Sequence, residues 1–238
     1  MSDQARAPTL TRRQKAWGWL TDYGYVAAWL ARAVVARGTP EDLLTPPVAE
    51  PGPPVLLVPG VYENWRFLQP VGVRLYRAGH PVHVLDGLGW NTGTIAEAAG
   101  VVGAYLERLD LSDVTVIAHS KGGLIVKYAL ADAATRRRVR RLVAVNSPFN
   151  GSWWATYLPL PAVHVFAPRG RVIRELAAQA AANASITSLY SAFDPHIPET
   201  GHLDGAENVV LRTVGHFRPL VDPVTLATID EVLSRPNG

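Results

Sequence analysis

The sequence of 238 residues contains no cysteine. The chain therefore forms no disulfide bond and no metal site with thiolate ligands. It also lacks a basic stripe with interleaved aromatic residues, which is the usual footprint of a nucleic-acid-binding protein. The formal net charge is only +3, and many of the arginines stand singly. We therefore expect neither a disulfide scaffold nor a nucleic acid partner.

An apolar run long enough to cross a membrane is missing as well. Residues 15–37 read KAWGWLTDYGYVAAWLARAVVAR, and Asp22, Arg32 and Arg37 interrupt this stretch. Charges at such places are unfavourable both in a transmembrane helix and in the core of a signal peptide. The preceding Thr11-Arg12-Arg13 resembles a twin-arginine export signal, but the apolar residues that should follow it are absent.

Residues 15–37 nevertheless have the apolar spacing of a helix. The positions that carry this spacing are Trp17, Leu20, Tyr23, Ala27, Leu30, Ala31 and Val34. Three interpretations stay open: a helix packed on the domain or on a second subunit, an interfacial membrane helix, and an export segment. We expect a cytoplasmic protein, with peripheral membrane contact through residues 15–37 or export as the alternatives. The oligomeric state does not follow from the sequence.

The chain divides at a proline-rich linker. Residues 38–54, GTPEDLLTPPVAEPGPP, are poorly suited to regular structure. We therefore predict an N-terminal helical appendage with its linker over residues 1–54, the first dozen residues being polar and mobile. Residues 55–238 then form the main domain, a length that fits one α/β domain.

Strand and helix patterns alternate along the main domain, residues 55–238. Short β-branched runs predict strands at 55–58, 82–85, 114–118, 141–145, 186–190 and 209–214. Helical spacing predicts helices at 67–78, 95–109, 124–130, 171–182 and 223–233. This alternation predicts a mostly parallel central sheet with helices on both faces.

Residues 149–185 break that alternation. The segment contains Trp153, Trp154, Tyr157 and the run LPLPAVHVF. Long insertions in α/β domains are often functional, so we predict a cap over the site with an apolar lining. The alternative is that these aromatic residues belong to the core.

The strand at 114–118 leads into the stretch Ala118-His-Ser-Lys-Gly122, which precedes a helix. A serine in a sharp strand-to-helix turn between small residues is typical of a nucleophile elbow. The turn is strained and crowded, which is why its neighbours have to be small. The usual pattern is G-x-S-x-G, and here alanine replaces the first glycine. We predict that Ser120 is a nucleophile.

Ser120, Asp194 and His216 each follow a predicted strand directly, and they occur in the order Ser, Asp, His. Catalytic groups in open parallel sheets gather at the carboxyl ends of the strands, and this order is that of a hydrolase triad. A serine hydroxyl needs a base within reach, and the base needs an orienting carboxylate. Asp194 is preferred because it directly follows a predicted strand. Asp86 follows an earlier strand, and we interpret Asp204 and Asp222 as surface residues or helix caps, with Asp204-Gly205 typical of a turn.

The remaining histidines receive other roles. We expect His164, His196 and His202 to lie exposed in loops, and we interpret His119, next to the serine, as a packing residue. No set of aspartate and histidine residues has the sequence spacing of a metal site. We therefore expect no metal and no cofactor.

These ordered motifs resemble the α/β-hydrolase family, and more narrowly the small bacterial lipases of the Bacillus minimal-lipase type. Ala118-His-Ser-Lys-Gly122 is similar to that group's A-H-S-x-G elbow, alanine included. Tyr190-Ser-Ala-Phe-Asp194 looks like its acid-bearing strand end, and residues 203–217, LDGAENVVLRTVGHF, look like its histidine segment. The resemblance covers residues 55 to about 220.

The resemblance implies a role for each matching residue. Ser120 is the nucleophile, His216 the general base and Asp194 its orienter, while the backbone N–H groups of Val61 and Lys121 form the oxyanion hole. Two departures stand out. Pro59-Gly60 replaces the usual His-Gly, which leaves the backbone donor in place, and Lys121 stands where such lipases often carry Met or Gln. We expect the Lys121 side chain either near the oxyanion or in solvent.

The expected function is that of a serine esterase or lipase, acting on a small-molecule or lipid ester through an acyl-enzyme. The alternatives are an acyltransferase with the same triad, and an inactive hydrolase-fold module that binds a membrane or a partner. From their positions, we expect five aromatic residues to line the substrate pocket: Tyr62, Trp65, Trp153, Trp154 and Phe217.

Overall fold

The computed structural model describes residues 10–35 and 40–235. Most of the predicted mobile N-terminal segment, residues 1–9, lies outside the described residues, as do residues 36–39 of the helix end and linker. Within the linker, Pro40–Leu43 forms a short 3₁₀ helix. The chain from there to residue 54 has no further helix or strand.

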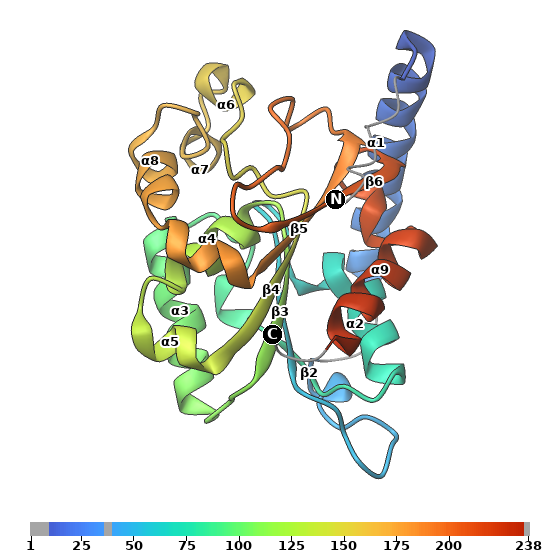
Figure 1. Cartoon of the computed structure of the whole chain (residues 1–238). Coiled ribbons are helices and arrows are strands. Elements are labelled where there is room, and N and C mark those ends of the chain that lie inside the picture. Colours follow the sequence, from blue (N-terminus) through green and yellow to red (C-terminus); the bar gives the residue numbers. More distant parts are fainter. Residues whose placement is uncertain (1–9, 36–39, 236–238) are drawn as a thin grey trace, which may run out of the picture.

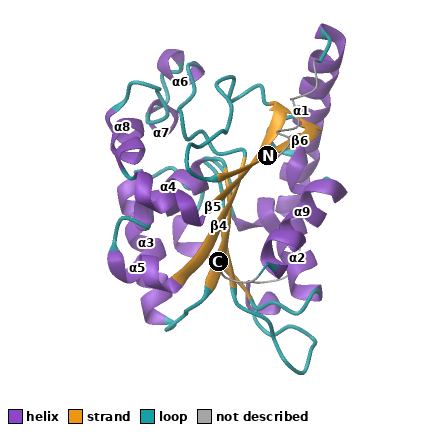
Figure 2. Cartoon of the chain, in the orientation of Figure 1, coloured by secondary structure: helices purple, strands orange, loops and turns teal. Residues whose placement is uncertain are grey.

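A sheet of six parallel strands forms the centre of the molecule (Figure 2). Its spatial order is β2-β1-β3-β4-β5-β6, and every neighbouring pair is parallel. The strands are β1 (Val55–Val58), β2 (Val82–Val84), β3 (Val114–His119), β4 (Val139–Val145), β5 (Ile186–Phe193) and β6 (Glu207–Val214). The predicted parallel sheet is confirmed, and each predicted strand is found within a few residues of its expected bounds.

Helices cover both faces of this sheet (Figure 1). One face carries α3 (Ile95–Arg108), α4 (Lys121–Ala129) and α5 (Ala133–Arg138). The other carries α2 (Gln69–Arg77), which follows the 3₁₀ helix η2 (Trp65–Leu68), and α9 (Pro223–Ser234). The helices confirm the α/β architecture that the sequence predicts.

The strand β1 shows why the sheet has a hydrophobic core on each side. Leu56 and Val58 belong to the core beneath α3 and α4, whereas Val55 and Leu57 belong to the core beneath α2 and α9. Successive side chains of a strand point to opposite faces, so a strand covered on both faces has to be apolar throughout. Burying one such side chain contributes roughly 1.5–3 kcal/mol.

Side-chain caps determine where the two longest surface helices of the domain begin. Thr94 and Glu97 form a reciprocal capping box at the start of α3. Asp222 accepts a hydrogen bond from the N–H of Thr225 at the start of α9. Each cap satisfies backbone donors that a helix end leaves free, which contributes about 1 kcal/mol. The interpretation of Asp222 as a helix cap is confirmed.

The segment between β4 and β5 lies over the carboxyl ends of the strands (Figure 1). It contains α6 (Trp154–Tyr157), α7 (Pro161–His164), α8 (Arg171–Ala178) and the 3₁₀ helix η4 (Ala180–Ser185). Ala155, Phe166 and Leu176 are buried in the core, whereas Trp154 and Tyr157 are exposed. Apolar residues of this insertion therefore both anchor it to the domain and cover its outer surface.

The N-terminal helix α1 (Arg12–Val35) packs beside β6 and η2. Trp29 is buried and donates its Nε1–H to the carbonyl oxygen of Phe67 at 3.3 Å. At Gly18 the helix comes so close to β6 that an added Cβ would lie 2.2 Å from Cγ1 of Val214. Of the described helices, none combines the length and apolar character needed to cross a bilayer. Packing on the domain is thus the interpretation of residues 15–37 that the contacts support.

Candidate active site

Ser120 lies in a strained turn between β3 and α4. Its φ of 50° and ψ of −119° are far from the conformations that a non-glycine residue ordinarily adopts. Its N–H donates to the carbonyl of Val145 at 3.0 Å, which holds the turn to the neighbouring strand. A Cβ on Gly122 would lie 2.3 Å from the carbonyl oxygen of Val58, so only glycine fits at that position. The backbone therefore has the geometry of a nucleophile elbow.

Asp194 follows β5, His216 follows β6, and their side chains meet. Nδ1 of His216 lies 2.6 Å from Oδ2 of Asp194, and both residues are buried. The other oxygen, Oδ1, accepts the backbone N–H groups of His196 and Ile197 at 2.8 and 3.3 Å. With Nδ1 engaged, Nε2 is the nitrogen of His216 that remains to exchange a proton with a reacting group.

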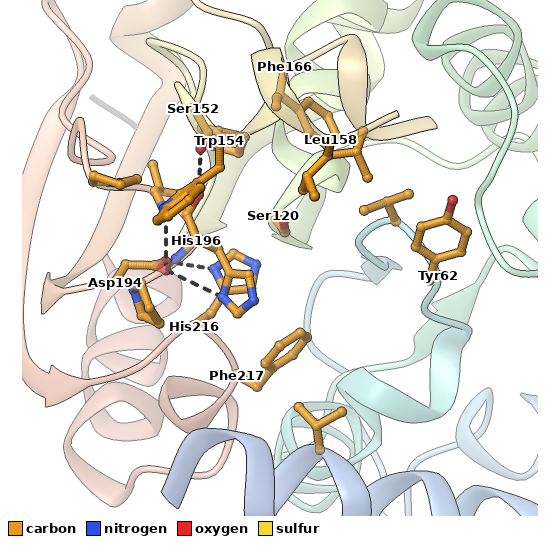
Figure 3. Close-up of a pocket in the computed structure, with 18 of the residues that line it drawn as sticks. Tyr62, Ser120, Ser152, Trp154, Leu158, Phe166, Asp194, His196, His216 and Phe217 are labelled. Carbon is orange, nitrogen blue, oxygen red and sulfur yellow. Dashed lines mark hydrogen bonds and ion pairs between the residues drawn. The ribbon is translucent and has the colours of Figure 1, made fainter. Parts of the chain in front are cut away.

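Ser120, Asp194 and His216 all line one cavity (Figure 3). Within residues 10–35 and 40–235, no hydrogen bond joins Ser120 to His216. Catalytic hydrogen bonds of this kind often shorten only when substrate is bound. The fold thus brings the three predicted residues to one site, with the acid and the base already paired.

Burial and ion pairing shift the pKa values of Asp194 and His216 in opposite directions. Burial alone disfavours the charged form of each group, but the carboxylate and the imidazolium stabilise each other across their short contact. The net effect lowers the pKa of Asp194 below its usual value and raises the pKa of His216 above its own. Asp194 is therefore ionised at neutral pH and holds the His216 ring in one orientation.

The turn Pro59–Tyr62 lies directly beside the serine. A Cβ on Gly60 would lie 3.0 Å from Cβ of Ser120, and the N–H of Gly60 donates to Oε2 of Glu63 at 2.8 Å. Val61, the next residue, lines the cavity. Lys121 is the first residue of α4, where backbone N–H groups have no partner within the helix. The two predicted oxyanion donors therefore belong to segments that adjoin Ser120.

The cavity has a volume of about 1020 Å³ and is mostly apolar. Tyr62, Trp153, Trp154 and Phe217 line it, as the sequence predicts. Trp65 does not, and this prediction is wrong. The Trp65 ring packs against the core on the α2 side, with the guanidinium of Arg66 above it, and Phe67 reaches the cavity instead.

The sequence profile of the alpha/beta hydrolase fold matches residues 53–171, which is half of the chain. The chain belongs to the alpha/beta hydrolase fold family. The match begins just before β1 and ends at the start of α8, so it includes the Gly60 turn, the serine elbow and most of the insertion.

Solved structures of other hydrolases have the same fold. The mature lipase BlEst2 of Bacillus licheniformis is 15% identical, with a TM-score of 0.64 over 79% of this chain and 96% of the lipase. An alpha/beta hydrolase fold protein from Burkholderia ambifaria is 20% identical, with a TM-score of 0.58 over 77% of this chain and 91% of that protein. A hydrolase from Oleispira antarctica is 15% identical, with a TM-score of 0.57 over 84% and 99%. No curated protein matches the sequence of this hydrolase.

The side chain of Lys121 takes neither of its expected positions in this hydrolase. It is buried, and Nζ donates to the carbonyl oxygens of Asn91 and Gly93. Burial lowers the pKa of Lys121 to about 8, although Glu97 opposes the shift. Lys121 therefore holds the loop before α3 in place and does not face the oxyanion position or solvent. Sequence pattern gave no sign of this, because the loop lies about thirty residues away in the chain.

His119 is more than a packing residue. It is fully buried, with Nδ1 2.8 Å from Oε1 of Glu63 and Nε2 3.0 Å from the carbonyl oxygen of His216. Glu63 also accepts the N–H of Gly60. This pair of side chains thus links the turn before Val61 to the loop that carries His216.

His196 differs from the expectation of an exposed loop residue. It is partly buried in the cavity wall, with its ring 4.8 Å from that of His216 and Nε2 2.9 Å from the hydroxyl of Tyr23. Burial lowers the pKa of His196 to about 4, so the ring is neutral at neutral pH. His164 is exposed as expected, but it is the last residue of α7 and does not lie in a loop. His202 lies in a loop and is of intermediate burial, with its side chain 41% exposed.

Asp194, His196 and His216 present ligand atoms within 4.8 Å of one another, a grouping that the sequence spacing did not indicate. Both oxygens of Asp194 already accept hydrogen bonds, and Nδ1 of His216 is bonded to one of them. Nε2 of His196 is bonded to Tyr23, whereas its Nδ1, 3.8 Å from Oδ1 of Asp194, has no hydrogen-bond partner among the described residues.

The N-terminal helix supplies residues that the motif analysis missed. Trp19, Tyr23 and Val26 of α1 line the cavity. Asp22 is fully buried. Its carboxylate accepts the backbone N–H groups of His216, Phe217 and Arg218, which belong to the loop after β6, here called the histidine loop. The one signal in the sequence was an acidic residue interrupting an apolar helical face.

Proposed function

We propose that this hydrolase is a serine esterase that cleaves carboxylic esters with a bulky apolar group. The observation that carries the proposal is the buried Asp194–His216 pair, which lines the same apolar cavity as the strained Ser120. This is the arrangement that acyl transfer through a serine requires. The similarity to the lipase from Bacillus licheniformis supports the same chemistry.

The reaction follows from the roles of these groups. Oγ of Ser120 attacks the ester carbonyl while Nε2 of His216 takes the hydroxyl proton. The backbone N–H groups of Val61 and Lys121 stabilise the oxyanion, where a single donor typically contributes about 3 kcal/mol. The alcohol leaves with the proton from His216, and water activated by the same ring then hydrolyses the acyl-enzyme.

The cavity supports a neutral, apolar substrate. Within the described part of the chain, its lining contains no lysine or arginine that would bind an anion. The acidic side chains in the lining, Glu63 and Asp194, are engaged by His119 and His216. A volume of 1020 Å³ lies at the upper end of ordinary small-molecule sites, which span about 300–1,000 Å³. An extended acyl chain fits such a space.

The decisive experiment compares the wild-type protein with Ser120→Ala on p-nitrophenyl esters from acetate to palmitate. We expect turnover that is fastest for medium or long chains, and a fall of roughly 10⁶-fold in kcat in the variant. Circular dichroism should show an unchanged fold. A folded Ser120→Ala variant that still hydrolyses the esters would disprove the assignment, and wild-type inactivity on every chain length would disprove the substrate class.

A further inference from the structure

A single buried carboxylate of α1, that of Asp22, accepts three backbone N–H groups of the loop that carries His216. Oδ2 of Asp22 accepts the N–H of His216 at 2.9 Å, and Oδ1 accepts those of Phe217 and Arg218 at 2.9 and 3.0 Å. These three N–H groups open the 3₁₀ helix Arg218–Leu220 (η5), whose first donors have no partner within the helix. Hydrogen bonds to an ionised acceptor are about twice as strong as neutral ones.

The backbone of His216 is held on its other side as well. Its carbonyl oxygen accepts Nε2–H of His119 at 3.0 Å and Nδ2–H of Asn146 at 2.8 Å. Asp194 holds the ring of the same residue through Nδ1. Of these contacts, only the one from Asp22 comes from outside the sheet and its adjoining loops.

Helix α1 packs closely against the end of β6 and the loop that carries His216. Gly215 has a φ of 117°, and a Cβ on it would lie 2.5 Å from Oδ1 of Asp22. Four residues earlier in α1, Gly18 makes its close approach to Val214. A residue with a side chain at either position would separate α1 from the histidine loop.

We propose that Asp22 is a positioning residue for the catalytic base, and that α1 is therefore a working part of the active site. Asp22 holds the peptide of His216 so that Nε2 faces the Ser120 hydroxyl. The same helix contributes Trp19, Tyr23 and Val26 to the wall of the substrate cavity. This inference rests on the proposed function, because it deepens the role of the same site.

The test compares Asp22→Asn with the matched control Thr21→Ala. The neighbouring Thr21 bonds to carbonyl oxygens of its own helix and to the guanidinium of Arg218, but not to the His216 loop backbone. With the p-nitrophenyl ester series, we expect Asp22→Asn to lower kcat roughly 10- to 100-fold at every chain length, since small misplacements of a catalytic group cost about this much. KM should stay unchanged, and Thr21→Ala should match the wild type.

A pH profile separates positioning from a general loss of stability. The charged groups that face His216 are Asp194, Asp22 and the Glu63–His119 pair, with His196 packed against its ring. Removing the Asp22 charge disfavours the imidazolium form of His216. The acid limb of kcat/KM should therefore move to lower pH in Asp22→Asn. A merely structural role would reduce the amount of active protein and leave the limb in place.

Labelling of Ser120 with a fluorophosphonate probe keeps the two proposals apart, because it needs His216 as base but no particular ester. A wild-type protein that labels but hydrolyses no ester would refute the proposed substrate while leaving the Asp22 test intact. We expect labelling of Asp22→Asn to be slowed as much as kcat. If that variant fails to fold, Asp22→Ser, which keeps one acceptor oxygen, is measured instead. A folded variant with wild-type labelling rate and pH limb overturns the inference.

Discussion

The carboxyl edge of the sheet and the helix α1 contribute to the same cavity, but they encode their contributions differently. Ser120, Asp194 and His216 each lie within two residues of the end of a strand, so a local pattern in the sequence points to each of them. Asp22 acts 194 residues away from His216, on a helix that no motif connects to the site. A site residue that follows a strand in a recognisable motif can be predicted from the sequence. A site residue that reaches the site because its helix packs there can be identified only from the three-dimensional structure.

The comparison predicts the largest effect at the sheet edge. Replacing Asp194 with Asn removes the charge that orients His216 and stabilises its imidazolium form, while the side chain keeps its shape. We expect kcat for ester hydrolysis to fall by about 10⁴-fold, as is typical when an orienting carboxylate becomes an amide. The variant should unfold at nearly the temperature of the wild type in calorimetry. If Asp194→Asn lowers kcat less than Asp22→Asn does, α1 contributes more to turnover than the carboxyl edge of the sheet, contrary to this prediction.

A second large effect is expected beneath the elbow. In Gly122→Ala, the new Cβ meets backbone atoms of Val58 and Pro59, which cannot move aside without displacing β1. Overpacking of this kind typically costs about 1–3 kcal/mol, and a backbone obstacle favours the upper end. Urea unfolding should show that loss, together with reduced turnover because the turn before Val61 shifts. Wild-type stability in this variant would mean that the elbow is less tightly packed than the distances indicate.

The pH dependence of turnover tests the pair at the centre of the site. His216 must be neutral to accept the serine proton, and its pKa is raised above the usual value of about 6.5. The neutral fraction grows as pH rises through that pKa, so kcat/KM should climb on an acid limb whose midpoint lies above 6.5. Below the midpoint, the rate should fall about tenfold per pH unit. A midpoint below 6.5 would show that burial outweighs the ion pair with Asp194.

Much of the sheet region follows from the sequence for physical reasons. Strands covered on both faces are continuous apolar runs, and the breaks between them are rich in glycine, proline and polar residues. The order of the triad residues along the chain then fixes which edge they share. The expectations for Trp65, Lys121 and His196 are wrong because tertiary packing, which no local pattern encodes, decides where each side chain lies. Lys121 is buried by the Asn91–Gly93 loop, and His196 by Tyr23 of α1.

A smaller loss of stability is expected where α1 packs against β6. In Gly18→Ala, the obstacle is the side chain of Val214, which has some freedom to rotate, so the helix is displaced rather than expelled. We expect a stability loss of about 1–2 kcal/mol, less than for Gly122→Ala. Turnover should fall together with the contact from Asp22. Gly24→Ala is the matched control, because a Cβ at Gly24 meets nothing within 4 Å.

The smallest effect is expected on the outer side of α1. The Trp17 side chain is 68% exposed, and a surface change away from any packed contact usually alters stability by less than about 0.5 kcal/mol. Trp17→Ser should therefore leave unfolding and the hydrolysis of soluble esters unchanged.

The same variant tests the peripheral membrane contact expected for this helix, because an exposed tryptophan is an effective interfacial anchor. If α1 binds lipid through this side, Trp17→Ser should reduce cosedimentation with liposomes and leave kcat unchanged. If Asp22 holds the loop that carries His216, Asp22→Asn should lower kcat and leave cosedimentation unchanged. Equal sedimentation of both variants and the wild type would restrict the role of α1 to the active site.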